Sequence, residues 1–208
     1  MDELELFKKE WQKKGEDLPK LSYEEIYKML WKRSSSIVKW IFYISLIEFV
    51  FWISLDLVAT LTGFRPQFDF PNSDIFLWSM YAIFYPVILY FIYSFYKNYN
   101  RINTTDNVKG LMNSIIKTRK TVKQYVWFNL IFFFLFSGIL YLLLFKYDPT
   151  FFDLNGNESL NFYMVLILSI VLTLLFFSVL IWLFYRLIYG ILLKRLHKNY
   201  RELEDLDL

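Results

Sequence analysis

The chain has 208 residues, of which 56% are hydrophobic and 22% aromatic, and its formal net charge is +3. This apolar share exceeds the roughly 45–50% of soluble domains and is concentrated in long uncharged runs, which is typical of a polytopic membrane protein. The lack of cysteine excludes disulfides and thiol catalysis, and the single histidine, His197, excludes any site that needs two imidazoles from this chain.

Residues 1–21 form a charged segment of mixed sign that carries Leu4, Phe7 and Trp11 at helical spacing. We expect a short amphipathic segment in the cytoplasm that ends at "GEDLPKLS". Its apolar side has three candidate docking surfaces, namely the rest of the bundle, lipid, and a cytoplasmic protein partner. The first long apolar run starts only near Ile37, so no cleavable signal peptide is expected.

The sequence "SYEE" at 22–25 predicts the start of a helix. It matches a capping box, in which the Ser22 side chain accepts from the backbone N–H of Glu25 while the Glu25 side chain accepts from that of Ser22. Neither Pro nor Gly follows before the first apolar run. We therefore expect one helix to begin at Tyr23 and to continue unbroken into the first span.

The stretch before the first span has an apolar side made by Ile26, Leu30 and Trp31. We take these three residues as candidate contacts for a cytoplasmic protein partner, together with the three of the amphipathic segment. Similar apolar stripes precede the third span and follow the fourth. Two arrangements stay open: the helices protrude into the cytoplasm as a packed bundle, or the stripes lie on the membrane surface.

Four apolar stretches are long enough to cross a membrane, since about 30 Å of hydrocarbon takes roughly 20 helical residues. They are approximately 40–61, 75–96, 125–145 and 162–185. Each is expected to be an α-helix, because a backbone in lipid must satisfy its own hydrogen bonds. The predicted fold class is therefore all-α. It comprises two helical hairpins, 22–101 and 102–201, with cytoplasmic helical extensions and an acidic tail at 202–208.

Lys and Arg are distributed unevenly among the segments outside the spans. Residues 1–39 hold nine, residues 97–124 seven and residues 186–208 five, whereas the other two loops hold only Arg65 and Lys146. By the positive-inside rule, both termini and the middle loop face the cytoplasm. We expect a multi-pass membrane protein with both termini on the cytoplasmic side.

The two halves of the chain share a weak similarity. "SIVKWIFYISLIEF" (36–49) aligns with "TVKQYVWFNLIFFF" (121–134), and the outer loops share Pro, Phe, Asp and Asn in the same order. A parallel tandem repeat would pack two equivalent hairpins into one four-helix bundle. The alternative is chance agreement between apolar sequences of low complexity.

The first span contains a carboxylate, Glu48, within "YISLIEFVFWISLDLV". It lies eight residues beyond Trp40, roughly 12 Å along the helix. An ionised carboxylate at this depth costs at least ~2.5 kcal/mol, so Glu48 is expected to be protonated, to face the bundle interior or to reach a water-filled crevice. A structural hydrogen bond, proton or cation handling, and a self-association contact stay open as its role. Candidate polar partners at similar depth are Tyr85, Tyr90, Asn129, Thr173 and Ser178.

Two segments, "SSSIVKWIF" (34–42) and "IIKTRKTVKQYVWFNL" (115–130), resemble small uncharacterised four-span inner-membrane proteins of Bacteroidota. Such proteins often bear the label carotene monooxygenase. That label implies a carotenoid-cleaving enzyme whose iron is held by four histidines, which His197 alone does not supply. The resemblance implies the four spans and the inner membrane, and we do not expect the enzymatic activity.

The chain contains no glycine-rich phosphate loop and no nucleophile elbow. We predict a non-enzymatic integral membrane protein without cofactor or metal, a regulatory or interaction protein that presents cytoplasmic helices to a protein partner. The alternative is a small carrier or channel subunit built around Glu48, which would be a homo-oligomer because four short spans are few for transport. The basic inner surface is explained by topology and anionic lipid, so the bilayer is an expected partner and nucleic acid is not.

Overall fold

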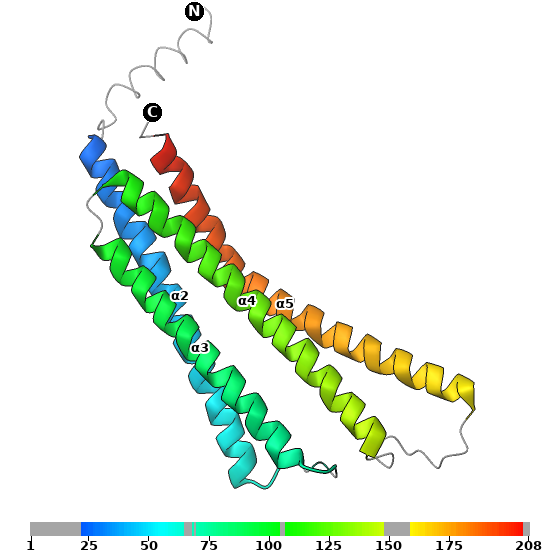
Figure 1. The fold of residues 1–208 in the computed structure, drawn as a ribbon. Coiled ribbons are helices and arrows are strands. Elements are labelled where there is room, and N and C mark those ends of the chain that lie inside the picture. The colour runs from blue at the N-terminus through cyan, green and yellow to red at the C-terminus, as the bar shows by residue number, and fades with distance from the viewer. Residues whose placement is uncertain (1–21, 65–67, 69, 105–106, 148–158, 206–208) are drawn as a thin grey trace, which may run out of the picture.

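The computed structural model describes residues 22–64, 68, 70–104, 107–147 and 159–205. They form four long helices, which are α2 (Tyr23–Leu61), α3 (Ser73–Asn103), α4 (Val108–Tyr147) and α5 (Leu160–Glu204). Neighbouring helices run in opposite directions (Figure 1). The start of α2, the α3–α4 turn and the end of α5 lie together at one end, which we call the basic end; the opposite end is the loop end. The predicted all-α, four-helix class is confirmed.

Helix α2 begins with the capping box that the sequence predicts. The backbone N–H of Ser22 donates to the Glu25 carboxylate at 2.8 Å, and the Ser22 hydroxyl accepts from the Glu25 N–H at 3.3 Å. The Ser22 N–H and then the Ser22 hydroxyl, which donates to the same carboxylate at 3.0 Å, favour its ionised form and hold the pKa of Glu25 below its usual value. The helix then runs without a break from Tyr23 to Leu61.

All four helices are long and apolar enough to cross a membrane. Helices α2, α4 and α5 have 39, 40 and 45 residues, far more than the roughly 20 that hydrocarbon requires. The surplus of each lies towards the basic end, where the helices continue beyond the stretches 40–61, 125–145 and 162–185. The protein is thus a bundle with an apolar half and a more polar half.

The tightly packed core lies in the half near the basic end. Several side chains there have no exposed surface at all: Val38, Ile102, Leu111, Ile115, Leu196 and Leu203. In the apolar stretches, by contrast, only 6% to 17% of the residues are buried within the protein. A helix in lipid can leave apolar side chains on its outer surface, whereas helices in water must bury them against one another. The packing therefore changes along the bundle axis.

The apolar stripe at the start of α2 packs inward. Leu30 is only 3% exposed, and the Trp31 indole N–H donates to the backbone carbonyl of Ile102 at 2.9 Å. Ile26 is partly buried against the same core. Leu30 is therefore buried and Ile26 and Trp31 are partly buried within the protein itself, and their role as contacts for a cytoplasmic partner stays a prediction. Leu4, Phe7 and Trp11 lie outside the described residues.

Helices α2 and α3 contact each other near both ends, and so do α4 and α5. Between α4 and α5, Arg119 contacts His197 near the basic end, and the rings of Phe145 and Tyr163 meet near the loop end. Between α2 and α3, Ser35 donates to the side chain of Asn103 near the basic end. Near the loop end of the same pair, the Tyr81 hydroxyl of α3 donates to the Asp56 carboxylate of α2.

Helices α2 and α5 pair over only part of their length. Hydrogen bonds and an ion pair join them at Glu48 and nearer to the basic end. Asn199 donates to Ser34 at 3.0 Å, and Arg33 lies 3.8 Å from Glu202. Towards the loop end, α5 leans away from α2 (Figure 1). The two helices therefore leave a seam between them, which is closed near the basic end and open near the loop end.

Candidate functional site

The candidate site is a cavity of about 860 Å³ on this seam, lined by side chains of all four helices. Its volume lies in the range of sites that hold small molecules, about 300–1,000 Å³. Most of its wall is aromatic or aliphatic, with Phe51, Trp52 and Leu55 from α2, Phe84 from α3, Phe132, Phe133 and Phe136 from α4, and Phe177, Leu180 and Phe184 from α5. The cavity is therefore suited to an apolar occupant.

Glu48 lies on the wall of this cavity and is held by tyrosines of α5. The Tyr185 hydroxyl donates to one carboxylate oxygen, and the Tyr189 hydroxyl lies 3.4 Å from the other. Tyr125 of α4 packs edge-on against both tyrosines, with ring centroids 5.8 and 5.9 Å apart. All three rings are buried, at 1% to 5% exposure. We call Tyr125, Tyr185 and Tyr189 the tyrosine cluster.

The tyrosine cluster explains why the bundle tolerates a carboxylate here. Removing a carboxylate from water is costly unless it gains hydrogen bonds, and phenol hydroxyls donate such bonds without adding a second charge. The same contacts join α5 to α2 across the seam. Glu48 therefore faces the bundle interior, one of the three arrangements that the sequence left open.

Two of the five residues proposed as partners of Glu48 reach the cavity. Asn129 and Tyr85 line it together with Glu48. The Asn129 amide nevertheless donates to the backbone carbonyl of Tyr125 on its own helix, at 2.8 Å. The Tyr85 ring packs edge-on against Phe49 at 6.2 Å.

The other three proposed partners do not contact Glu48. Tyr90 is 63% exposed on the outer surface of α3. Thr173 bonds the backbone carbonyl of Ser169 on its own helix at 2.8 Å. The Ser178 hydroxyl is buried, with no hydrogen-bond partner among the described residues. These residues are candidates because they lie at a depth similar to that of Glu48. Depth alone does not identify its partners, because it does not say which side of each helix faces the seam.

The tyrosine cluster was missed because it lies at the ends of predicted spans. On α2, Glu48 is eight residues inside the apolar stretch, whereas Tyr185 is the last residue of the stretch 162–185 and is followed by Arg186. The two helices are therefore staggered and cross obliquely (Figure 1). Tyr185 and Tyr189 are four residues apart and so lie on one face of a helix, and this spacing could have indicated a shared partner.

A second carboxylate, Asp56, lines the cavity farther towards the loop end. It accepts a hydrogen bond from the Tyr81 hydroxyl of α3 at 2.9 Å. Eight residues separate it from Glu48, so the two carboxylates lie roughly 12 Å apart along α2. The apolar cavity thus has a polar group towards each of its ends.

The cavity opens sideways between α2 and α5. The residues that border the seam are half exposed, with Phe51 and Trp52 at 54% on α2 and Phe177 and Phe184 at 47% and 52% on α5. This opening lies in the apolar half of the bundle, where the outer surface is suited to lipid. The opening therefore lies on the part of the outer surface that is suited to lipid.

Among the described residues there is no group of three or more His, Cys, Asp or Glu side chains that could hold a metal ion. Comparison with curated proteins and with solved structures gave no match. One family model, described as a domain of unknown function (DUF8845), matches residues 24–208, which include all four described helices except the first residue of α2. The chain belongs to the family of the domain of unknown function DUF8845.

Proposed function

We propose that this chain is a non-enzymatic inner-membrane protein that holds an apolar or amphipathic molecule, taken from the bilayer, in the cavity on the α2–α5 seam. The observation that carries this proposal is the sideways opening of an apolar cavity of about 860 Å³ with Glu48 on its wall. A long hydrocarbon would fill the aromatic part, and a hydroxyl or a protonated carboxyl group at its end would donate a hydrogen bond to Glu48.

The orientation follows from the charge distribution. The basic segments 1–39, 97–124 and 186–208 hold 21 of the 23 Lys and Arg residues. Under the positive-inside rule, this distribution supports a cytoplasmic basic end and an external loop end. The cavity then opens into the part of the bilayer that extends from the level of Glu48 towards the outer surface.

A small oligomeric carrier or channel subunit that uses Glu48 is a weaker alternative. Conduction needs a polar path past Glu48, and the tyrosine cluster occupies the space on its basic side. Val38 and Ile41, both fully buried, fill the core beyond it. These features favour holding a molecule over passing one through.

The proposal is tested by filling the cavity with one substitution. Ala59 lines the cavity, whereas Ala82 lies exposed on α3 and lines no part of it. The protein is purified in mild detergent, and co-purified molecules are extracted and identified by mass spectrometry. We expect one apolar species near equimolar amount with the native protein and with Ala82→Trp. Ala59→Trp should retain about a fifth of it or less, because the indole occupies the site.

Equal amounts in the two tryptophan variants would contradict the proposal. So would a native protein that carries only the bulk phospholipids of the membrane. Thermal unfolding of both variants serves as the folding control, since a destabilised Ala59→Trp protein would lose its occupant for another reason.

A second candidate is a regulatory protein that binds a cytoplasmic partner. It is favoured by the packed helical half near the basic end, which continues beyond the apolar stretches and has the fully buried Leu111, Ile115 and Leu196 in its core. A rigid platform of this kind is not needed to hold a lipid. Pull-downs from solubilised membranes would compare the intact chain, a chain without residues 1–21 and Glu48→Gln. A cytoplasmic protein recovered with the first and third alone supports this candidate, and no partner in any sample contradicts it.

A further inference from the structure

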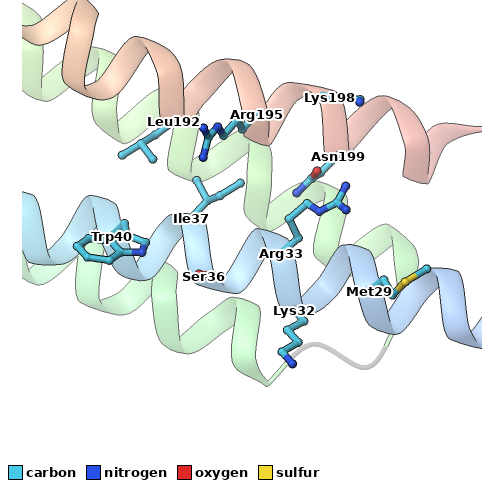
Figure 2. A pocket seen from close by; sticks show the side chains of 10 residues that line it. All are labelled: Met29, Lys32, Arg33, Ser36, Ile37, Trp40, Leu192, Arg195, Lys198 and Asn199. Carbon is cyan, nitrogen blue, oxygen red and sulfur yellow. The ribbon is translucent and has the colours of Figure 1, made fainter.

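A second hollow lies on the same seam, in the half near the basic end. It measures about 680 Å³ and is bounded by α2 and α5 alone (Figure 2). We call it the basic groove. It is separate from the cavity described above, because the contacts of Glu48 with Tyr185 and Tyr189 close the seam between the two.

Four cationic side chains line the basic groove: Lys32, Arg33, Arg195 and Lys198. Figure 2 shows Arg33 on α2 and Arg195 on α5 reaching from facing helices into the space between them, whereas Lys32 points away from α5. Each guanidinium group provides planar donors of the kind that bind phosphate oxygens, and the two lie at different positions along the groove, that of Arg33 beside Asn199 and that of Arg195 towards Leu192 (Figure 2).

The charge of the basic groove is only partly balanced. Among the described residues, Glu202 is the one carboxylate paired with a cation of the groove, at 3.8 Å from Arg33 and 3.7 Å from Lys198. Both distances exceed the 2.7–2.9 Å of a close charge-assisted hydrogen bond. Arg195 has no acidic partner in the described part of the chain. A further anion would therefore be attracted.

The groove changes from polar to apolar towards the membrane half. Ile37 lines its middle, and Leu192 and the 57% exposed Trp40 lie at the end next to the apolar stretch of α2 (Figure 2). Tryptophan is typical of the level where lipid headgroups meet acyl chains. Cations followed along one groove by tryptophan and leucine match the order of phosphate and hydrocarbon in a phospholipid. A free phosphate ion or an acidic peptide would make no use of the apolar end.

We propose that the basic groove binds the anionic headgroup of a phospholipid, with Arg33 and Arg195 on the phosphate and with Trp40 and Leu192 against the first carbons of the acyl chains. The inference does not depend on the occupant of the larger cavity. The bound lipid would belong to the cytoplasmic leaflet and would lie on the part of the seam between Glu48 and the basic end.

The test uses the full chain in detergent micelles, titrated with phosphatidylglycerol or with zwitterionic phosphatidylcholine and observed by native mass spectrometry. The double variant Arg33→Gln with Arg195→Gln should bind phosphatidylglycerol about thirtyfold more weakly, since each of the two basic groups contributes about 1 kcal/mol and 1.4 kcal/mol corresponds to a factor of about ten. The matched control, Lys117→Gln with Lys120→Gln, removes the same charge from exposed positions of α4 outside the groove. It should change binding by less than about twofold, because distant exposed charges are screened.

Glu202→Gln should strengthen binding, and a loss of folding would not produce that result. This carboxylate competes with a phosphate for Arg33 and Lys198, so its neutralisation should strengthen phosphatidylglycerol binding by about two- to fivefold. Unchanged or weaker binding of this variant would overturn the proposal.

Four further results would also overturn it. An equal loss in the α4 control would mean that overall charge, and not the groove, attracts the lipid. Equal binding of phosphatidylcholine would remove the need for an anion. Displacement of phosphatidylglycerol by excess inorganic phosphate would identify a free ion as the occupant, and displacement by a poly-glutamate peptide would identify an acidic protein.

Discussion

Tyr185 of α5 donates a hydrogen bond to the carboxylate of Glu48 on α2, and beyond this contact the two helices diverge towards the loop end (Figure 1). The contact separates two hollows on one seam, a basic groove on one side and an apolar cavity on the other. The Tyr185–Glu48 pair thus marks the boundary between the closed part of the seam and the part where α2 and α5 diverge.

We predict a measurable coupling between Tyr185 and Glu48. In a double-mutant cycle of Tyr185→Phe and Glu48→Met, the interaction energy should be about 0.6–1.7 kcal/mol, the range found for hydrogen bonds between membrane helices. It is measured from reversible unfolding in mixed micelles. The matched cycle uses Tyr90→Phe, because Tyr90 is 63% exposed and distant from the seam, and its coupling should be near zero. Equal coupling in both cycles would contradict the prediction.

Two leucines of α5, one buried and one exposed, should respond differently to the loss of their side chains. Leu196 is fully buried near the basic end, whereas Leu187 is 65% exposed. Leu196→Ala should lower the free energy of unfolding by about 2–5 kcal/mol, because it leaves a cavity in a packed core. Leu187→Ala should change it by less than about 0.5 kcal/mol. Comparable losses measured by unfolding in the same micelles would show that the core does not lie where we place it.

The single histidine should report the state of the α4–α5 contact. The Arg119 guanidinium donates to Nδ1 of His197 at 3.0 Å, which requires that nitrogen to be unprotonated. Desolvation of the partly buried ring, followed by the charges of Arg119 and Arg201, lowers the pKa of His197, and Glu204 opposes this effect.

The sign of the pH effect follows from this lowered pKa. The unfolded chain takes up a proton near the ordinary value of 6.5 and the folded chain only at lower pH. The free energy of unfolding should therefore fall as the pH drops below about 6.5, and the fall should stop below the folded pKa. His197→Gln should remove this dependence. NMR titration of the one imidazole gives the folded pKa directly, and a value at or above 6.5 would refute the argument.

The proposed orientation is testable with single cysteines, because the chain has none of its own. Phe64, 84% exposed, lies at the loop end, and Lys198 is exposed near the basic end. A membrane-impermeant maleimide should label Phe64→Cys in intact cells and Lys198→Cys only after lysis. The reverse pattern would place the basic end outside.

Much of the fold was predictable because it depends on local sequence. The four long helices follow from the length of the apolar runs, and the start of α2 follows from the spacing of Ser22 and Glu25, whose capping box is confirmed. What the apolar side of α2 around Leu30 packs against was not predictable in the same way. Periodicity identifies an apolar side of a helix, but it does not say whether that side meets the protein's own core or another molecule.

The sequence alone therefore determined which residues are helical, how long the apolar stretches are and that Glu48 needed polar partners. Only the tertiary structure decided that those partners are Tyr185 and Tyr189, 137 and 141 residues away along the chain. The rotation and stagger of four packed helices arise from side-chain contacts between distant segments, and no local pattern encodes them. The same stagger brings the middle of one apolar stretch against the end of another and leaves the seam open beyond that point.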